Sequence, residues 1–215
     1  MPTPVVLISG CSSGIGRALA DAFKAAGYSV WAGARKTADL EQLSAAGFIA
    51  VALDVNDATA IGQAVERLGR EAGRLDILIN NAGYGGIAPL LDGGVEAIHR
   101  QFETNVYSLV GVTRACFDLL RASKGLVVNI GSVSGVMTTP YAGAYCASKA
   151  AVHAMCDALR MELAPFSIEV MEVQPGAIES NFGANASQHA EQLICESSPW
   201  WPLHEGIRTR ANVSQ

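Results

Sequence analysis

Near its start the chain reads Val5-Val6-Leu7-Ile8-Ser9-Gly10-Cys11-Ser12-Ser13-Gly14-Ile15-Gly16. The β-branched run Val5–Ile8 predicts a strand buried on both faces, and the apolar spacing of Arg17–Phe23 predicts a helix. Between them, Gly10 allows a tight turn, Gly14 lets the backbone approach a pyrophosphate, and Gly16 permits close packing of helix on strand. The helix N-terminus would offer oriented N–H groups to the phosphates. The spacing G-x-x-x-G-x-G differs from the usual G-x-G-x-x-G, so a turn that only joins a strand to a helix stays an alternative.

Strands and helices alternate along the rest of the chain, without an evident linker or internal repeat. Short apolar runs predict six strands, centred on Val5–Ser9, Ser29–Ala32, Ile49–Leu53, Ile77–Asn80, Leu126–Gly131 and Ile168–Gln174. Helical patterns lie between them, such as Asp57–Glu71 with its apolar positions Ile61, Ala64, Val65 and Leu68. This order predicts an α/β fold, a doubly wound parallel sheet of the Rossmann type with helices on both faces. Ligands of such sheets bind outside the carboxyl ends of the strands.

A second informative segment is Tyr145-Cys146-Ala147-Ser148-Lys149, which begins a predicted helix from Ala144 to about Ala164. Residues four apart lie on the same helix face, so an ammonium is held beside a phenol. A neighbouring positive charge lowers the pKa of a phenol, and we therefore expect Lys149 to lower the pKa of Tyr145. Such a phenol can exchange a proton with an alcohol or carbonyl. Taken alone, the pair could equally be a core tyrosine followed by a solvated lysine.

Four further segments fall at strand ends or on the helices that follow them. Asn80-Asn81-Ala82-Gly83 follows one apolar run, Asn105 lies in a helical stretch, Ser132 follows the run Leu126–Ile130, and Pro175-Gly176 closes the last strand. In this order, the motifs of the chain resemble those of the short-chain dehydrogenase/reductase family over roughly residues 5–180. Within that family, Arg35 and the Tyr145–Lys149 segment are closest to members of the steroid and retinol dehydrogenase type.

The resemblance implies an oxidoreductase that moves a hydride between a nicotinamide cofactor and a carbonyl or secondary alcohol. Tyr145 would be the general acid or base, Lys149 would assist it and contact the nicotinamide ribose, and Ser132 would bind the substrate oxygen. Asn105 would hold a water that links Lys149 to solvent, while Ser134 competes with Ser132 for its role. The residues implied to bind the cofactor are Gly10, Ser12, Ser13, Gly14, Ile15, Gly16, Arg35, Lys36, Asp54, Val55, Asn81, Ala82, Gly83, Tyr145, Lys149, Pro175 and Gly176.

The end of the second predicted strand bears on the choice of cofactor. NAD sites carry an acidic residue there for the ribose 2′-hydroxyl, whereas an arginine suits the 2′-phosphate of NADP. This chain has Arg35 and Lys36 and no acidic residue at that point, so we expect NADP(H) to be preferred and NAD(H) to be possible. Arg35 could instead begin a solvated helix. Asp54 resembles the family's adenine-contacting aspartate, but it could also cap a helix or a turn.

Composition limits the function classes. The chain has 215 residues, half of them hydrophobic and 16% charged, and a net charge of −5. This length fits one domain spanning residues 1–215, and the charge offers no general attraction to nucleic acid or anionic lipid. No run approaches the ~20 apolar residues of a membrane span. Five cysteines without paired spacing favour a cytoplasmic location, and no metal site is expected.

The C-terminal part departs from the family. After Pro175-Gly176 we expect a substrate lid within residues 177–215, and the polar stretch from Glu179 onward shows no further strand. A shortened chain is therefore our expectation, since a missing last strand would expose a sheet edge. The pocket segments, namely Tyr84–Leu90, Val136–Ala142 and the part after Gly176, carry aromatic residues and few charges. They favour an apolar ketone, aldehyde or alcohol, steroid-like or retinoid-like, as the substrate.

Two other functions remain as alternatives, and an oligomeric state is also expected. An NADP-binding sensor without turnover is the main alternative, although such proteins tend to lose the tyrosine or serine that this chain keeps. An epimerase or dehydratase would need a longer C-terminal substrate domain. The resemblance also implies a homodimer or homotetramer paired through two long helices, where small side chains would permit close packing, at Ala147, Ala150, Ala151 and Ala154.

Overall fold

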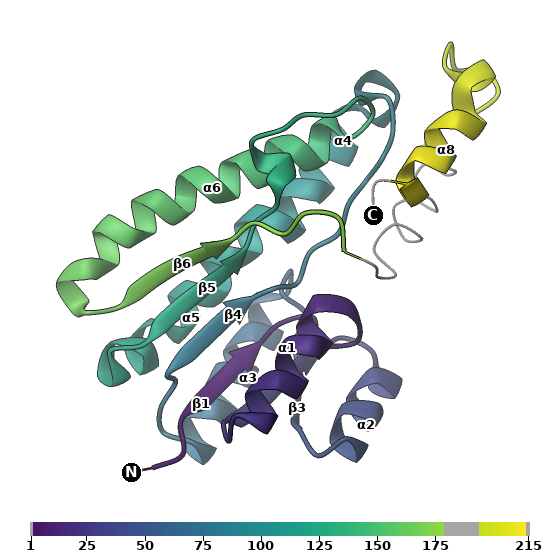
Figure 1. Ribbon diagram of the computed structural model, residues 1–215. Coiled ribbons are helices and arrows are strands. Elements are labelled where there is room, and N and C mark those ends of the chain that lie inside the picture. Colours follow the sequence, from purple (N-terminus) through teal and green to yellow (C-terminus); the bar gives the residue numbers. More distant parts are fainter. Residues whose placement is uncertain (1, 179–193, 214–215) are drawn as a thin grey trace.

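The computed structural model describes residues 2–178 and 194–213. In this part of the chain, six parallel strands form one sheet in the order β3-β2-β1-β4-β5-β6 (Figure 1). The strands are β1 (Val5–Ile8), β2 (Ser29–Ala34), β3 (Ile49–Ala52), β4 (Ile77–Asn80), β5 (Leu126–Ile130) and β6 (Glu169–Val173). The predicted doubly wound sheet is thus confirmed, and the predicted strand ends differ from the observed ones by at most two residues.

Helices cover both faces of the sheet. On one face, α3 (Ala58–Glu71), α5 (Ser108–Ser123) and α6 (Gly143–Leu163) enclose a core with β1, β3, β4 and β5. On the other face, α1 (Gly14–Ala25) and α2 (Thr37–Ala45) enclose a second core, lying in front of the sheet in Figure 1. Because both faces are covered there, the strand residues are apolar without alternation.

Local sequence explains where α3 begins and which side it buries. The Asp57 side chain accepts a hydrogen bond from the Thr59 N–H at 2.8 Å, which caps the first turn. Ile61, Ala64 and Leu68 are buried at helical spacing. The predicted helix Asp57–Glu71 is therefore confirmed within one residue.

The segment between β4 and α5 is less regular. Helix α4 (Leu90–Phe102) contains a break at Gly94, whose φ of 61° is left-handed. This agrees with the flexible Asp92-Gly93-Gly94 sequence. A π-helical turn, η1 (Glu103–Tyr107), then joins α4 to α5. Such turns often occur at functional sites, and this one carries Asn105.

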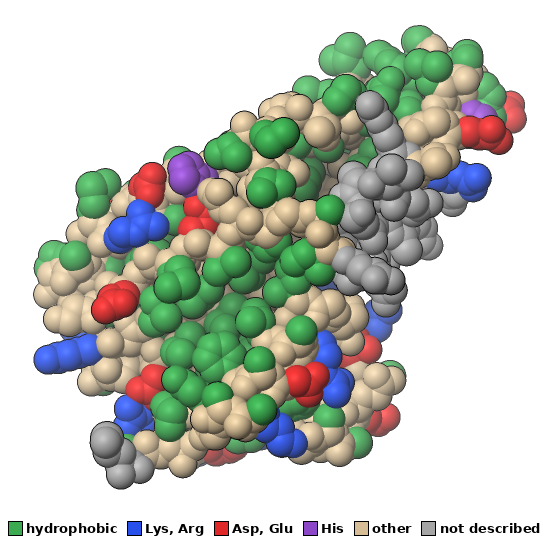
Figure 2. Space-filling view, in the orientation of Figure 1, with side chains coloured by type: hydrophobic (Ala, Val, Ile, Leu, Met, Phe, Trp, Pro, Cys, Tyr) green, Lys and Arg blue, Asp and Glu red, His purple; other side chains and the backbone are tan. Residues whose placement is uncertain are grey.

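The sheet face opposite α6 is exposed along its last strand. Met171 and Val173 of β6 are about half exposed there, whereas Val128 and Ile130 of the neighbouring β5 are buried. Figure 2 shows hydrophobic side chains gathered over this face of the molecule. In the described residues no strand pairs with the outer edge of β6.

Short elements complete the described chain. They are three 3₁₀ turns and a last helix, namely η2 (Val133–Gly135), η3 (Ala164–Phe166), η4 (Trp201–Leu203) and α8 (His204–Val213). Much of the predicted lid, residues 179–193, lies outside the described residues. No helix in residues 2–178 and 194–213 combines the length and the apolar character needed to cross a bilayer.

Candidate active site

The order of the strands fixes where a ligand can bind. The chain winds outward from β1 to β3, and then from β4 to β6 in the other direction. The crevice at this reversal lies beyond the carboxyl ends of β1 and β4, where ligands of such sheets bind. The glycine-rich loop follows β1, and Asn81-Ala82-Gly83 follows β4, so two of the predicted motifs meet there.

The glycine-rich loop has the backbone that its sequence predicts. Gly10 and Gly14 adopt left-handed φ angles of 71° and 57°. A Cβ atom on Gly16 would lie 2.2 Å from the carbonyl oxygen of Gly10. The loop therefore depends on glycine for its conformation and for its approach to α1.

Asn81 fastens this loop to the loop after β4. Its Nδ2 donates to the carbonyl oxygens of Ser9 and Gly10, at 2.9 and 3.0 Å. The Ser9 hydroxyl in turn accepts hydrogen bonds from the backbone N–H groups of Asn81 and Ala82, both at 3.0 Å. The Asn81 side chain thus fixes the position of the glycine loop relative to the loop after β4.

The mouth of the loop is open to a phosphate. Ser12, Ser13 and Gly14 are exposed, whereas Ile15 packs against the core between the sheet and α1. Ser13 precedes α1, and its side chain makes no capping hydrogen bond. The first N–H groups of α1 are therefore not capped by that hydroxyl, as a phosphate site at a helix N-terminus requires.

Two cationic side chains follow the end of β2. Arg35 and Lys36 are exposed, and within the described part of the chain neither side chain takes part in a hydrogen bond or ion pair. They are therefore available to an anion at the mouth of the crevice. The alternative for Arg35, the start of a helix, is not observed, because α2 begins at Thr37 with Lys36 before it.

Asp54 has the turn role that the sequence left open. Its Oδ1 accepts a hydrogen bond from the Asn56 N–H at 3.0 Å, while Asp57 caps the following helix. The side chain of Val55 is buried in the core. A ligand beside this turn would meet the backbone of Val55 and the remaining carboxylate oxygen of Asp54.

Tyr145 and Ser132 come together from different elements. Tyr145 lies in the first turn of α6, and Ser132 follows β5 directly. Their side chains are hydrogen-bonded, and this bond lowers the pKa of Tyr145, although burial outweighs it and raises that pKa. The Ser132 Oγ also accepts a hydrogen bond from the Ser134 N–H at 3.1 Å. Ser132, not Ser134, is thus the serine that contacts the phenol.

Lys149 is buried beneath this pair. Its Nζ donates to the Ile130 carbonyl oxygen at 2.6 Å and lies 5.9 Å from the centroid of the Tyr145 ring. Burial lowers the pKa of Lys149 to about 8, opposed by the charge of Glu172. The expectation that Lys149 lowers the pKa of Tyr145 is wrong for this structure. Burial acts on both groups and favours their neutral forms.

Asn105 holds the backbone of the loop after β4. Its Oδ1 accepts from the Tyr84 N–H, and its Nδ2 donates to the Tyr84 carbonyl oxygen, both at 3.0 Å. The same Nδ2 lies 3.1 Å from the Ser148 hydroxyl. Gly83 is packed so closely that a Cβ atom on it would lie 3.1 Å from the Asn105 Oδ1. Asn105 therefore links this loop to α6, next to Lys149.

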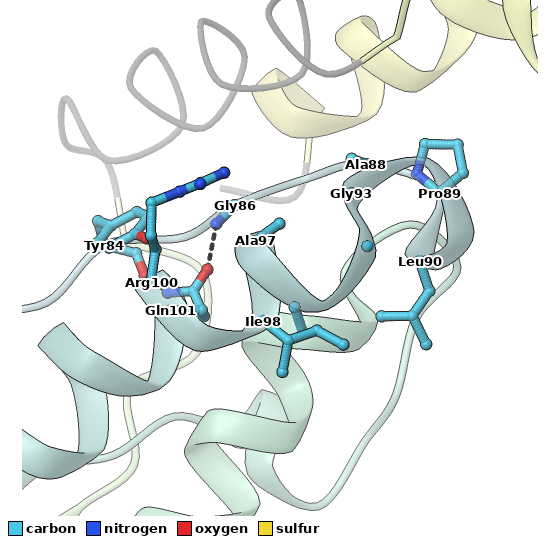
Figure 3. A pocket seen from close by; sticks show the side chains of 12 residues that line it. Tyr84, Gly86, Ala88, Pro89, Leu90, Gly93, Ala97, Ile98, Arg100 and Gln101 are labelled. Atoms are coloured by element: carbon cyan, nitrogen blue, oxygen red, sulfur yellow. Dashed lines mark hydrogen bonds between the residues drawn. The ribbon is translucent and has the colours of Figure 1, made fainter. Parts of the chain in front are cut away.

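Gln101 is a site residue that the sequence did not reveal. It is buried, accepts a hydrogen bond from the Gly86 N–H at 2.7 Å, and donates to the Tyr84 carbonyl oxygen (Figure 3). A glutamine within a helical pattern carries no signal of this role. The one hint was its position four residues before Asn105, on the same helical face.

The last predicted pair lies at the opposite end of the crevice. Pro175 follows β6, and its carbonyl oxygen accepts a hydrogen bond from the Val133 N–H at 3.1 Å. Gly176 is exposed, with open space where a Cβ atom would stand. The pair therefore borders the turn that carries Ser132.

A small cavity lies beside Tyr84 and Gln101, between α4 and the start of α6 (Figure 3). Tyr84, Pro89 and Leu90, from the segment Tyr84–Leu90, are among the residues that line it. Its volume of about 30 Å³ admits roughly one water molecule. None of the four predicted catalytic residues lines it.

Comparison with known sequences agrees with this geometry. A family model described as short chain dehydrogenase matches residues 4–191. The 3-ketodihydrosphingosine reductase of Bacteroides thetaiotaomicron is 38% identical over 186 residues, which cover 86% of this chain and 68% of that protein. The NADPH-dependent 3-dehydrocapnine reductase of Ornithobacterium rhinotracheale is 37% identical over 190 residues, covering 84% and 67%. The chain thus spans about two thirds of the length of these relatives.

A solved structure is also similar. A short chain dehydrogenase from Burkholderia cenocepacia, crystallised in complex with NADP, superimposes with a TM-score of 0.78. It is 29% identical in sequence, and the match covers 85% of this chain and 76% of that one.

Proposed function

This chain belongs to the short chain dehydrogenase family, and we propose that it transfers a hydride between NADP(H) and an apolar carbonyl or secondary alcohol. Its relatives include reductases, which supports an oxidoreductase. NADPH dependence in the name of one relative, and NADP in a similar structure, support this cofactor.

The observation that carries the proposal is the assembly of Ser132, Tyr145 and Lys149 at one point. They come from the end of β5 and the first turns of α6, yet the Ser132 hydroxyl contacts the phenol and Lys149 lies directly beneath. The glycine-rich loop opens at the same edge of the sheet. This arrangement supports a proton donor and a dinucleotide site in one crevice, as carbonyl reduction requires.

The described residues fit a dinucleotide cofactor. The glycine loop leaves no room for a side chain at Gly16, and the exposed N-terminus of α1 can receive the pyrophosphate. Arg35 and Lys36 would hold the 2′-phosphate of NADP, while Asp54 and the backbone of Val55 would meet the adenine. When bound, the cofactor supplies or accepts the hydride.

The protein then supplies position and protons. We propose that the Ser132 hydroxyl and the Tyr145 phenol bind the substrate oxygen, and that Tyr145 donates the proton in reduction. The raised pKa of Tyr145 keeps the phenol protonated for that donation. Lys149 would replenish the proton, and Asn105 would hold a water between Lys149 and solvent.

Three further expectations belong to the same proposal. Residues 1–215 would act as one catalytic domain, with residues 177–215 as the cover of the substrate. A homodimer or homotetramer would pair through α5 and α6. The cytoplasm would be its location, an expectation that rests on the unpaired thiols of its five cysteines.

A substrate panel tests the proposal. Ketones, aldehydes and alcohols of increasing chain length are incubated with NADPH, NADH, NADP⁺ or NAD⁺ while absorbance of the reduced nicotinamide is followed. We expect turnover with NADP(H) that improves with the apolar size of the substrate. Tight NADPH binding without turnover on any substrate would favour a sensor and contradict the proposal.

A further inference from the structure

A layer of polar side chains crosses the sheet directly beneath α6. In the register of the strands, Asn80 of β4 pairs with Asn129 of β5, and Asn129 pairs with Glu172 of β6. Alternation along β6 places Glu172 on the same face as Val170, which belongs to the core under α6. Asn80 donates to the Asn129 Oδ1 at 2.9 Å, and the Asn129 Nδ2 donates to the Cys156 Sγ at 3.2 Å. Glu172 therefore occupies a position that this sheet otherwise fills with apolar or neutral residues.

The carboxylate of Glu172 is nearly sealed from solvent. Its side chain is 7% exposed, and its Oε2 lies 2.7 Å from the Nδ1 of His153 and 3.1 Å from the Nε2 of Gln174. Its Oε1 is buried without a hydrogen-bond partner among the described residues. A Cβ atom on Gly131 would lie only 2.2 Å from this oxygen. A buried carboxylate with an unpaired oxygen is costly unless a cation compensates it.

Two groups that can carry a positive charge interact with this carboxylate. The His153 Nδ1 is hydrogen-bonded to the Glu172 carboxylate, and the His153 side chain is 45% exposed, so the imidazole lies between the carboxylate and solvent. Lys149 lies one turn earlier on the same face of α6, and its Nζ donates a hydrogen bond to the carbonyl oxygen of Ile130, the residue before Gly131. The charge of Glu172 acts on Lys149 and favours its ammonium form against the effect of burial.

We propose that Glu172 is a positioning residue of the active site. Its buried carboxylate holds Lys149 in its cationic form, and the charge on His153 sets how strongly the carboxylate acts on Lys149. The inference rests on the proposed function, because it assigns Glu172 a role through Lys149.

Other charged groups around this cluster define the expected pH response. From α6, Cys156 and Asp157 face it, and the Nε2 of His153 lies 3.9 Å from Asp157. Arg160 of the same helix donates to the Val170 carbonyl oxygen of β6 and to Asp157. From β5, Asn129 contributes a neutral amide to the same face. Glu172 is thus the buried carboxylate whose charge acts on Lys149, and a cationic His153 would weaken that effect.

The first test measures Lys149 directly. The chain has four lysines, Lys24, Lys36, Lys124 and Lys149, so their side chains give few signals in NMR spectra of protein labelled with ¹³C-lysine. We expect Glu172→Gln to lower the pKa of Lys149 by about 1 unit or more, the scale of losing a nearby opposite charge. The control Glu169→Gln, an exposed position on the same strand, leaves it unchanged. An unchanged Lys149 titration in Glu172→Gln would overturn the inference.

The second test uses turnover. In the pH profile of kcat/KM, the limb that reports Lys149 should move to lower pH in Glu172→Gln by the same amount, and Glu172→Asp should restore most of the shift. A uniform loss of activity at every pH, with no displacement of the profile, would assign Glu172 a merely structural role. A wild-type protein that turns over no carbonyl would contradict the proposed function, while the lysine titration would still decide on the coupling.

His153→Gln provides an independent variant if Glu172→Gln does not fold. In the wild type, the Lys149 signal should show a second, smaller inflection where His153 titrates. Its disappearance in His153→Gln supports the inference, and its persistence contradicts it.

Discussion

Burial acts in opposite directions on the two titratable groups of the candidate site. It raises the pKa of the Tyr145 phenol and lowers that of the Lys149 ammonium to about 8. Each group is thus moved toward its neutral form, and each needs a specific partner to hold a charge. Ser132 provides that partner for the phenol, and Glu172 provides it for the ammonium.

At the residue scale, Arg35 is predicted to select the cofactor. Arg35→Asp should weaken NADPH binding about 10-fold or more, since hydrogen bonds to a charged phosphate contribute about 1.5–3 kcal/mol. NADH binding should change little or improve. Fluorescence titration with both nucleotides measures the ratio, and Arg70→Asp at an exposed position of α3 is the control. An unchanged NADPH to NADH ratio would remove Arg35 from the site.

Gly16 is predicted to tolerate no side chain. Gly16→Ala places a methyl group 2.2 Å from the Gly10 carbonyl oxygen, and such overpacking costs about 1–3 kcal/mol. Denaturant unfolding should show this loss, together with weaker NADPH binding. Gly62→Ala in α3 is the matched control, because nothing lies within 4 Å of its added Cβ, and it should be stabilising by about 0.5–1 kcal/mol. Equal stability of the two variants would contradict the role given to Gly16.

At the element scale, one loop is held by side chains from a helix and a π-helical turn. The segment after β4 makes its hydrogen bonds with Gln101 of α4 and Asn105 of η1, through the backbones of Tyr84 and Gly86. Gln101 follows the left-handed break at Gly94, and Asn105 lies in the π turn. The backbone of Tyr84 is therefore held by side chains from α4 and η1.

Replacing Gln101 tests this dependence. Gln101→Leu leaves the Gly86 N–H without its acceptor, and a buried unpaired group costs about 1–3 kcal/mol. Urea unfolding should show this loss, and KM for the carbonyl substrate should rise more than KM for NADPH. The exposed Gln63→Leu is the control. A variant as stable as the wild type, with unchanged KM values, would show that Gln101 does not hold the loop.

The sequence predicted regular elements better than the contacts between them. Strand runs such as Ile77–Asn80 and the capped helix after Asp57 follow from local pattern. The π turn around Asn105 does not, because its residues also suit an α-helix. The roles of Gln101 and Glu172 depend on neighbours far away in the sequence, and the raised pKa of Tyr145 depends on burial, which the i, i+4 spacing does not show.

At the scale of the whole molecule, folding stability should depend on pH through His153. The hydrogen bond with Glu172 and its charge raise the pKa of His153 above 6.5 in the folded state. The resulting stabilisation is fully present below the unfolded value of 6.5 and is lost as the pH rises through the folded pKa. The stability difference between wild type and His153→Gln should therefore be larger at about pH 5.5 than at about pH 8.5.

Urea unfolding at both pH values measures this difference, with His99→Gln as the control. His99 packs against the Tyr107 ring and forms no ion pair in the described part of the chain. A difference that is constant with pH, or that grows as the pH rises, would show that His153 and Glu172 are not coupled in solution.

Hydride transfer in a crevice where Tyr145 supplies the proton is the central proposal for this protein. The most direct measurement uses NADPH that carries deuterium at both C4 positions of the nicotinamide, and follows the label into the alcohol product by mass spectrometry. We predict a product one mass unit heavier with the wild type. With Tyr145→Phe we predict label transfer slower by at least about 100-fold, the usual contribution of a general acid, at unchanged NADPH affinity. Wild-type protein that binds NADPH yet passes no label to any carbonyl, or Tyr145→Phe that passes it at the wild-type rate, would contradict the account.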